Sequence, residues 1–402
     1  MYTRLPRLLT VLLLAGVLLA AGAPTQAQYT EITILATWDS AAERDDFYDL
    51  LFPFFQAENI QPNLVSETNL QQTLDQQIAS GAPPDVVLMR QPGLIAGYTD
   101  RLVNLDAVLG APASGYPPNL DALLTVNGTT YGRFVRLTAK GLVWYNGPAM
   151  SAAGYTLPGS WSELLTLTQV IDGDGGQPWA LGIRDEGAVS GVGTDIIETI
   201  LLQRHGPGLL DGLADGAVSW TDPRVREAWE EFGVLLDGAA RGTPVDAALS
   251  LFGSSPGAYL SVGPSTVPRW VMDQQAASAA DIGFFPLPAV DNPQRVIVGG
   301  DFVVLFNDDP VTLRLAQFLT TPELAAEWAA LGSALSPYPG APYPTAVQSR
   351  TADLALGQAA FDLSDRLTPD TRAAFETGVQ RFVTDQSALD TILADIQATA
   401  GN

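Results

Sequence analysis

The sequence predicts an α/β protein with two domains, each built on a sheet that helices cover. Its 402 residues are too many for one hydrophobic core, and 47% of them are apolar, enough to fill more than one. After the N-terminal segment, short β-prone runs alternate with amphipathic helical patterns. Such alternation is typical of parallel sheets whose strands are joined by right-handed helical crossovers.

The first 27 residues have the pattern of a secretory signal peptide. Arg4 and Arg7 form a basic start, and the apolar run 8–21 is short for a membrane span. Small residues end at Ala27, where cleavage is expected. An uncleaved anchor is the alternative. We therefore expect an exported protein, periplasmic or extracellular, with residues 1–27 as its signal peptide.

Composition excludes several classes of protein. The chain contains no cysteine, which excludes disulfides, thiolate metal sites, a cysteine nucleophile and a lipoprotein anchor. The formal net charge is −24, with Lys140 as the only lysine, so nucleic acid and anionic lipid are poor partners. The charge is dispersed, as on a solvated acidic surface.

The first third of the mature chain predicts a βαβαβ unit. The expected order is strand 32–36, helix 41–55, strand 61–67, helix 70–79 and strand 85–89. Ligands of such sheets bind outside the carboxyl ends of the strands. Here those ends are the stretches TWDSAAE, residues 37–43, and RQPG, residues 90–93.

Capping residues and prolines mark later helix starts. Ser160 and Glu163 form a capping box, in which each side chain satisfies a backbone N–H of the first turn. Pro223 and Pro322 occupy positions typical of a first helical turn.

Two further strands are expected toward the end of the chain, at 281–289 and in the stretch RVIVGGDFVVLF, residues 295–306. Two glycines and Asp301 interrupt the second one. A carboxylate in a strand interior is costly to bury without a partner, so Asp301 is a candidate functional residue.

Three motifs suggest catalysis or metal binding, and each lacks a required residue. Ser255 lies in a G-x-S-x-G pattern, but the only histidine, His205, precedes it, which is the wrong order for a hydrolase triad. The stretch 172–176 resembles an EF-hand start without its later ligands. The stretch 299–302 lacks one position of the diguanylate cyclase signature. We therefore predict no catalytic residue, metal or cofactor; the many carboxylates leave a secreted glycosidase as a lesser alternative.

Tryptophans provide a second kind of candidate. Trp229 and Trp328 lie on amphipathic helices and are predicted to be core residues. Trp38 and Trp179 lie beside turns and strand ends, where an indole face suits the C–H face of a sugar ring. For Trp38, a place in the binding wall and a place in the core remain alternatives.

Seven segments, in this order, are similar to solute-binding proteins of carbohydrate ABC importers, of the maltose-binding type and its alpha-glucoside branch. They are IASGAPPDVVLM (78–89), TAKGLVWYN (138–146), WSELLTLTQVI with GQPWALGI (161–183), TDIIETILL (194–202), GGDFVVLF (299–306), TPELAAEWAALG with LSPY (321–338) and FDLSDRLTP (361–369). Together they extend over nearly the whole mature chain.

The resemblance implies a two-lobed periplasmic-binding-protein fold of type II, in which each lobe is a mainly parallel sheet covered by helices. The ligand cleft would lie between the lobes, which close around a hinge. One lobe would hold residues 29–137 plus 301–333. The other lobe would hold residues 138–300 plus 334–402.

The resemblance also implies a set of ligand-binding residues, each matched by position. They are Trp38, Asp39, Glu43, Gln91, Trp179, Thr194, Asp195, Gly263, Gly300, Asp301 and Tyr338. Two stretches depart from the alpha-glucoside branch. Residues 191–196 lack the tryptophans and proline expected there, and the stretch LSVGPST, residues 260–266, stands where family members often carry polar or aromatic residues. The aromatic wall would therefore be thinner.

The expected function is that of a receptor without enzymatic activity. A monomer would bind an oligosaccharide or alpha-glucoside and deliver it to the transmembrane subunits of an ABC permease. The alternatives are the same fold with a polyol or a peptide as its ligand, and the secreted glycosidase. On this view Asp301 takes ligand hydroxyls, and its replacement by alanine would weaken binding without unfolding the protein.

Overall fold

The structure, a computed structural model, describes residues 29–38, 41–67, 69–184, 191–253, 255–289, 295–357 and 359–400. The predicted signal peptide and Asp39 lie outside the described residues. Among the helices it does describe, none combines the length and the apolarity of a membrane span.

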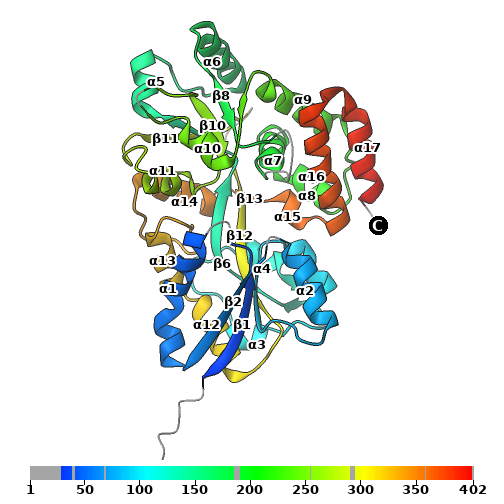
Figure 1. Cartoon of the computed structure of the whole chain (residues 1–402). Coiled ribbons are helices and arrows are strands. Elements are labelled where there is room, and N and C mark those ends of the chain that lie inside the picture. The colour runs from blue at the N-terminus through cyan, green and yellow to red at the C-terminus, as the bar shows by residue number, and fades with distance from the viewer. Residues whose placement is uncertain are drawn as a thin grey trace, which may run out of the picture.

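Two sheets form the centres of two lobes, stacked one above the other in Figure 1. The first sheet has the order β13-β12-β3-β1-β2, and β6 pairs with the other edge of β12. Its strands are β1 (Thr30–Ala36), β2 (Ile60–Ser66), β3 (Val86–Met89), β6 (Arg133–Lys140), β12 (Val296–Leu305) and β13 (Ala359–Phe361). A separate hairpin joins β4 (Thr125–Val126) to β5 (Thr129–Thr130).

The predicted βαβαβ unit is present in the first lobe, because β1 pairs in parallel with both β2 and β3. The helices of this lobe are α1 (Ala41–Ala57), α2 (Leu70–Ala79), η1 (Pro92–Gly97), α3 (Asp106–Leu109), α4 (Pro118–Leu123), α12 (Pro310–Leu319) and α13 (Pro322–Ala330). Phe47, Leu51 and Phe55 are the buried face of α1, as the spacing of its apolar residues predicts.

The second sheet has the order β11-β7-β10-β8-β9. Its strands are β7 (Leu142–Asn146), β8 (Trp179–Leu181), β9 (Ala240–Arg241), β10 (Leu260–Gly263) and β11 (Ile282–Pro286). Here β7 runs antiparallel to both of its neighbours, while β8 is parallel to β9 and β10. This sheet is thus more mixed than expected, because the chain enters β7 directly from β6 rather than through a helical crossover.

Helices surround the second sheet, and some of them extend the second lobe on one side (Figure 1). They are α5 (Gly147–Ala153), α6 (Trp161–Gly173), α7 (Val192–His205), α8 (Pro207–Ala214), α9 (Pro223–Leu236), α10 (Pro244–Leu249), α11 (Val267–Asp273), α14 (Ala346–Gly357), α15 (Leu363–Arg366), α16 (Pro369–Thr384), η2 (Gln386–Ala388) and α17 (Leu389–Thr399). The core positions predicted for Trp229 and Trp328 are confirmed, since both side chains are fully buried.

The predicted helix starts are also confirmed. The Ser160 hydroxyl accepts the Glu163 N–H at 3.2 Å, and Pro223 and Pro322 begin α9 and α13. The Glu163 carboxylate reaches one residue further back than a standard capping box, to the N–H of Gly159 at 2.7 Å.

The strands β6 and β12 connect the lobes (Figure 1). They pair antiparallel, with Leu137 opposite Gly300, and Leu335 forms an isolated bridge to Leu137. The three expected crossing points at 137/138, 300/301 and 333/334 therefore lie close together. The first sheet also includes β13 and the first half of β12, which the expected boundaries assign to the second lobe, because the ladder of β12 continues past the crossing.

Gly300 allows the close approach of these two strands. A Cβ at Gly300 would collide with the carbonyl oxygen of Arg136 and lie 3.0 Å from the Leu137 side chain. A Cβ at Gly299, on the opposite face, would lie 3.0 Å from Cε of Lys140, which is the flexible end of a side chain.

We therefore expect Gly300→Ala to lower the free energy of unfolding by roughly 1–3 kcal/mol, the usual cost of overpacking. The matched variant Gly299→Ala should lower it less, since the Lys140 side chain can shift. Urea denaturation of both variants measures the difference. Equal losses in the two variants would contradict the argument that a Cβ at Gly300 is destabilising because it collides with the Arg136 backbone.

Candidate functional site

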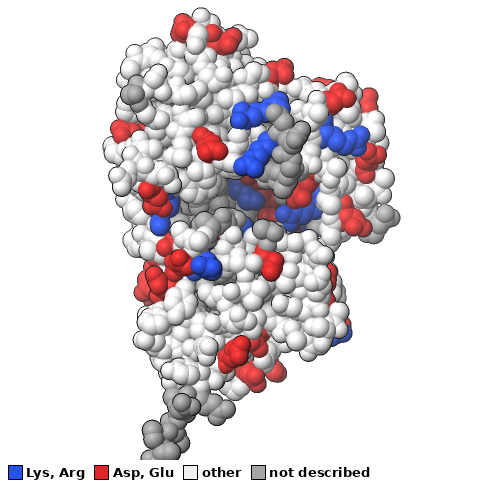
Figure 2. Space-filling model, in the orientation of Figure 1, with Lys and Arg blue, Asp and Glu red and all other residues white. Residues whose placement is uncertain are grey.

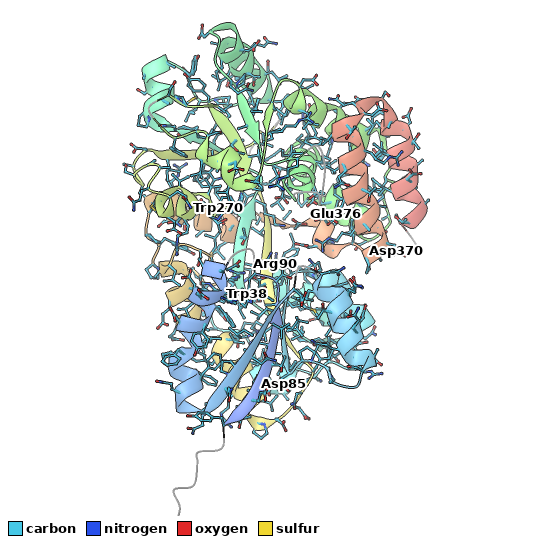
Figure 3. The ribbon with its side chains drawn as sticks, in the orientation of Figure 1. Trp38, Asp85, Arg90, Trp270, Asp370 and Glu376 are labelled. Atoms are coloured by element: carbon cyan, nitrogen blue, oxygen red, sulfur yellow. The ribbon has the colours of Figure 1, made fainter. Side chains whose placement is uncertain are left out.

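The surface is hollowed between the lobes, and Figure 2 shows both basic and acidic side chains inside the hollow. Figure 3 places Trp38 and Arg90 at the edge of the first lobe that faces the second lobe. Trp270 of α11 lies on the facing side of the second lobe. The candidate site is this region between the lobes, with β6 and β12 behind it.

Four charged side chains form the first group in this region, here called the arginine network: Glu43, Arg90, Arg136 and Asp301. Arg136 on β6 lies directly opposite Asp301 on β12, and its guanidinium pairs with both Asp301 and Glu43 of α1. Arg90, just after β3, pairs with Asp301 at 2.8 Å and donates to the Thr37 carbonyl oxygen at 3.0 Å. Two positive charges are thus balanced by two negative charges.

The arginine network changes the interpretation of Asp301. Burial alone would raise the pKa of this carboxyl, but the guanidinium groups of Arg136 and Arg90 outweigh burial and lower the pKa. Each carboxylate oxygen already accepts a hydrogen bond from an arginine, and the residue is 5% exposed. Asp301 therefore orients Arg90 and Arg136, and in this structure its carboxylate has no exposed face for a ligand.

Aromatic rings support the arginine network from below. Arg136 lies over the ring of Trp328, with Cζ 4.8 Å from the ring centroid. Trp328 contacts Phe47, and Phe47 in turn contacts Trp38 with ring centroids 4.7 Å apart. Trp38 is only 8% exposed. Of the two alternatives for Trp38, the structure favours the core, with one edge near the hollow.

A second group surrounds the only lysine and is here called the lysine cluster: Lys140, Asp195, Asp362, Asp365 and Glu198. Lys140 lies 2.5 Å from Asp362, 3.6 Å from Asp365 and 3.7 Å from Asp195. Glu198, one helical turn after Asp195, accepts the backbone N–H groups of Leu363 and Ser364 at the start of α15. Acidic groups therefore outnumber the single lysine.

This surplus of acid raises pKa values within the lysine cluster. Burial is the largest cause for Asp195, and the neighbouring charges of Asp362 and Asp365 add to it, so that its pKa rises to about 7 despite Lys140. Burial and Asp362 likewise hold the pKa of Glu198 well above its usual range. The cluster therefore retains protons near neutral pH.

The remaining predicted ligand residues are scattered. Gln91 begins η1 beside Arg90 and is partly exposed. The Thr194 hydroxyl donates to the Gly191 carbonyl oxygen at 2.8 Å, within the first turn of α7. The Gly263 carbonyl oxygen accepts the Trp144 indole N–H at 3.1 Å. These two bonds are internal to the second lobe and serve its packing.

Two predicted aromatic contacts do not fit the structure. Trp179 is 1% exposed, inside the core of the second lobe, and its N–H donates to Thr168 of α6. Tyr338 is 5% exposed, and its hydroxyl donates to the Thr320 carbonyl oxygen at 2.9 Å. Trp179 at the start of β8 and Tyr338 in a bend both turn inward because apolar packing is available there, so neither presents a ring to the hollow.

The basic half of the site was not predicted from the sequence. Arg136 and Lys140 lie in RFVRLTAK, an otherwise largely apolar strand, and Arg90 opens the strand-end stretch RQPG. A basic residue in a buried strand requires an acidic partner, which is a signal comparable to the one that singled out Asp301. Trp270 was not predicted either, because a lone aromatic residue in a short helix has no distinctive pattern in the sequence.

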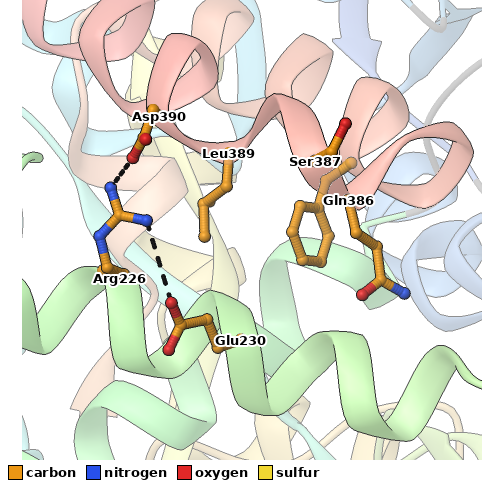
Figure 4. Close-up of a pocket in the computed structure, with 7 residues that line it drawn as sticks. Arg226, Glu230, Gln386, Ser387, Leu389 and Asp390 are labelled. Atoms are coloured by element: carbon orange, nitrogen blue, oxygen red, sulfur yellow. Dashed lines mark hydrogen bonds and ion pairs between the residues drawn. The ribbon is translucent and has the colours of Figure 1, made fainter.

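Elsewhere in the described residues, we find no competing centre. In the part of the chain that the structure describes, no three His, Cys, Asp or Glu side chains could hold a metal ion. A surface pocket of about 250 Å³ lies between α9 and the last helices (Figure 4). Arg226 there pairs with Asp390 and, at 3.9 Å, with Glu230, so its charge is used in holding α9 to α17.

Comparison with known proteins identifies the class. Residues 29–326 match the family described as bacterial extracellular solute-binding protein, and the chain belongs to this family. The predicted family and two-lobed fold are thereby confirmed. The family consists of binding proteins rather than enzymes.

Two relatives cover most of the chain. The osmoprotective compounds-binding protein GgtB of Synechocystis sp. is 30% identical over 359 residues, 84% of each chain. The alpha-glucosides-binding periplasmic protein AglE of Rhizobium meliloti is 28% identical over 399 residues, 91% of this chain and 86% of its own.

Solved structures share the fold. The solute receptor AcbH, described as preferring β-D-galactopyranose, has a TM-score of 0.76 at 20% identity and covers 92% of this chain and 98% of its own. RafE in complex with raffinose has a TM-score of 0.73 at 17% identity, with 92% and 98% covered.

We expect Asp301→Ala to lower the free energy of unfolding by about 3–5 kcal/mol, because it leaves buried guanidinium groups without their carboxylate. This replaces the expectation that the variant would lose binding only. Urea denaturation measures the loss, and Asp100→Ala is the matched control, since Asp100 pairs with Arg101 on the surface. A loss below about 1 kcal/mol for Asp301→Ala would contradict a stabilising arginine network.

A pH dependence follows from Asp195. Because its pKa is raised in the folded state, the folded protein holds a proton that the unfolded chain releases at lower pH. The stability that this proton provides is present below about pH 4 and is lost as the pH rises through about 7. Asp195→Asn should remove this loss.

We therefore expect the free energy of unfolding of Asp195→Asn, relative to wild type, to increase between pH 5 and pH 8. Urea denaturation at several pH values within this range measures the difference. The surface variant Asp100→Asn should show a constant difference. A constant difference for Asp195→Asn as well would mean that Asp195 does not hold the proton.

Proposed function

We propose that this protein binds an uncharged alpha-glucoside or short oligosaccharide between its lobes and delivers it to the permease of an ABC importer. The observation that carries the proposal is the charge-balanced arginine network, which lies between the lobes of a solute-binding fold. We expect the protein to act as a monomer, exported to the periplasm or the cell exterior.

The chemistry of the arginine network suits a sugar. A hydroxyl group both donates and accepts hydrogen bonds, and the partly exposed Arg90 and Glu43 offer one partner of each kind. Their positions are held by Asp301, Arg136 and the Thr37 carbonyl oxygen, so little ordering is needed when a ligand binds. Trp270, across the hollow, is partly buried and lies where a ring could pack on a sugar face.

The same groups disfavour an anionic ligand. Arg90 and Arg136 are matched by Asp301 and Glu43, and Lys140 is surrounded by three carboxylates. An added anion would meet acidic groups without a compensating charge, in a chain whose net charge is already −24. Uncharged solutes are therefore the ligands that this site accommodates at least electrostatic cost.

A polyol-like osmoprotective compound is the second candidate. It is favoured by the similarity to GgtB, which is named for osmoprotective compounds and is 30% identical. Such a solute presents hydroxyl groups of the same kind, so the arginine network would serve it equally. The glycosidase alternative lacks support from the comparisons, because the matching family and both relatives are described as binding proteins.

Isothermal titration with maltose, sucrose, trehalose and glycerol tests the proposal. We expect binding of at least one of them with a dissociation constant in the roughly micromolar range, about −8 kcal/mol. Maltobionate, an anionic analogue of maltose, should bind at least about tenfold more weakly than the neutral sugar, about 1.4 kcal/mol.

Arg90→Gln should weaken sugar binding, whereas Arg101→Gln should leave the affinity unchanged, because Arg101 is an exposed arginine of the same lobe. The absence of heat with every neutral solute would contradict the proposed function. Equal affinity for maltose and maltobionate would contradict the argument from charge.

A further inference from the structure

Arg269 connects the two lobes at their outer edge. Arg269 lies on α11 of the second lobe, and its Nη1 donates to the Leu331 carbonyl oxygen, at the end of α13 of the first lobe, at 2.6 Å. The same nitrogen lies 3.5 Å from Asp46 Oδ2 on α1 of the first lobe. Its Nε pairs with Asp273, one helical turn later on α11, at 2.6 Å.

This contact lies apart from the other place where the lobes meet. Figure 1 shows α11 next to α1 and α13 on one side of the molecule, and α15 close to the first lobe on the other side. On that other side, a Cβ at Gly93 of η1 would lie 2.5 Å from the Leu367 carbonyl oxygen, just after α15. The candidate site therefore lies between two contacts that join the lobes. One is the close backbone approach of Gly93 to Leu367, and the other is the ion pair of Arg269 with Asp46.

The three partners of Arg269 respond differently to a change in the distance between the lobes. Asp273 belongs to the same helix, so this pair persists whatever the lobes do. Leu331 and Asp46 both belong to the first lobe and both contact the same nitrogen of Arg269, so both contacts lengthen when the lobes separate. The Asp46 carboxylate is the charged partner of the two, and a single substitution removes its charge.

Asp46 is also linked to the candidate site. It lies on the same helix as Glu43, three residues later, and Glu43 pairs with Arg136 of the arginine network. Any movement of α1 relative to α11 therefore changes both the outer contact and the position of one acidic group in the site.

We propose that Arg269 is a positioning residue that holds the lobes together through Asp46 and so sets how readily the binding site opens. The proposal rests on the proposed function for its biological meaning, but the opening itself is measurable without a ligand. Arg269 and Asp46 are both partly exposed, at 24% and 21% of their side-chain area, so the pair is one of moderate strength.

The absence of cysteine in the chain makes the test direct. Gln56→Cys on α1 and Val170→Cys on α6 introduce one label in each lobe at exposed positions. Pulsed electron spin resonance or fluorescence energy transfer then reports the distance distribution between the lobes. In this labelled background, Asp46→Asn should increase the population of separated lobes about two- to fivefold.

Arg269→Ala should have a larger effect, since it removes all interlobe contacts of this side chain. Arg314→Ala is the control, because Arg314 pairs with Glu58 within the first lobe at 2.6 Å, although its side chain is more exposed than that of Arg269. This control removes an ion pair of comparable length and should leave the distance distribution unchanged.

For a sugar that binds the wild-type protein, Asp46→Asn should also raise the dissociation rate by a similar factor, with a smaller change in the association rate. Unchanged distances in Arg269→Ala and Asp46→Asn would overturn the proposal, whether or not any sugar binds. If the distances change as expected and no sugar binds, the positioning role stands and the proposed function fails.

Discussion

The pairing of Asp301 with Arg136 is the interaction on which the connection between the lobes depends. It joins neighbouring strands, β12 and β6, at the point where both run between the lobes. A charge buried there alone would be costly, and each side chain makes the burial of the other tolerable. The register of the two strands is therefore coupled to charge pairing as well as to the backbone ladder.

The same pairing determines which groups the site can present. Because Arg136 and Asp301 are satisfied by each other, the more exposed members Arg90 and Glu43 are the ones left at the surface of the hollow. Their positions are then fixed by partners behind them rather than by a ligand. A site of this kind is organised before binding, and it presents donors and acceptors with little net charge.

The strand and helix order of the first lobe was predictable, since apolar runs of period two and about four follow each other in TEITILA and the helix after it. Asp301 was predictable as a functional candidate too, because it interrupts an apolar strand, whereas Glu43 was proposed from the family resemblance. Arg136, the partner of Asp301, is 165 positions away, and only the register between β6 and β12 brings the two together. The prediction for Trp179 failed because an aromatic beside a strand end has one pattern in sequence, whether it faces core or cleft. The prediction for Tyr338 rested on the family resemblance alone.

Two charged groups flank the glycine segment of the connecting strands, and this arrangement explains how the two lobes can move as units. Arg136 and Lys140 lie four residues apart on one face of β6; the first pairs with Glu43 of the first lobe and the second with Asp195 and Asp362 beyond the crossing. Arg136 thus links β6 to the first lobe, and Lys140 links β6 to the second lobe. The closely paired segment at Gly300 lies between these ties, so a change in lobe angle must bend this segment while both charge groups remain intact.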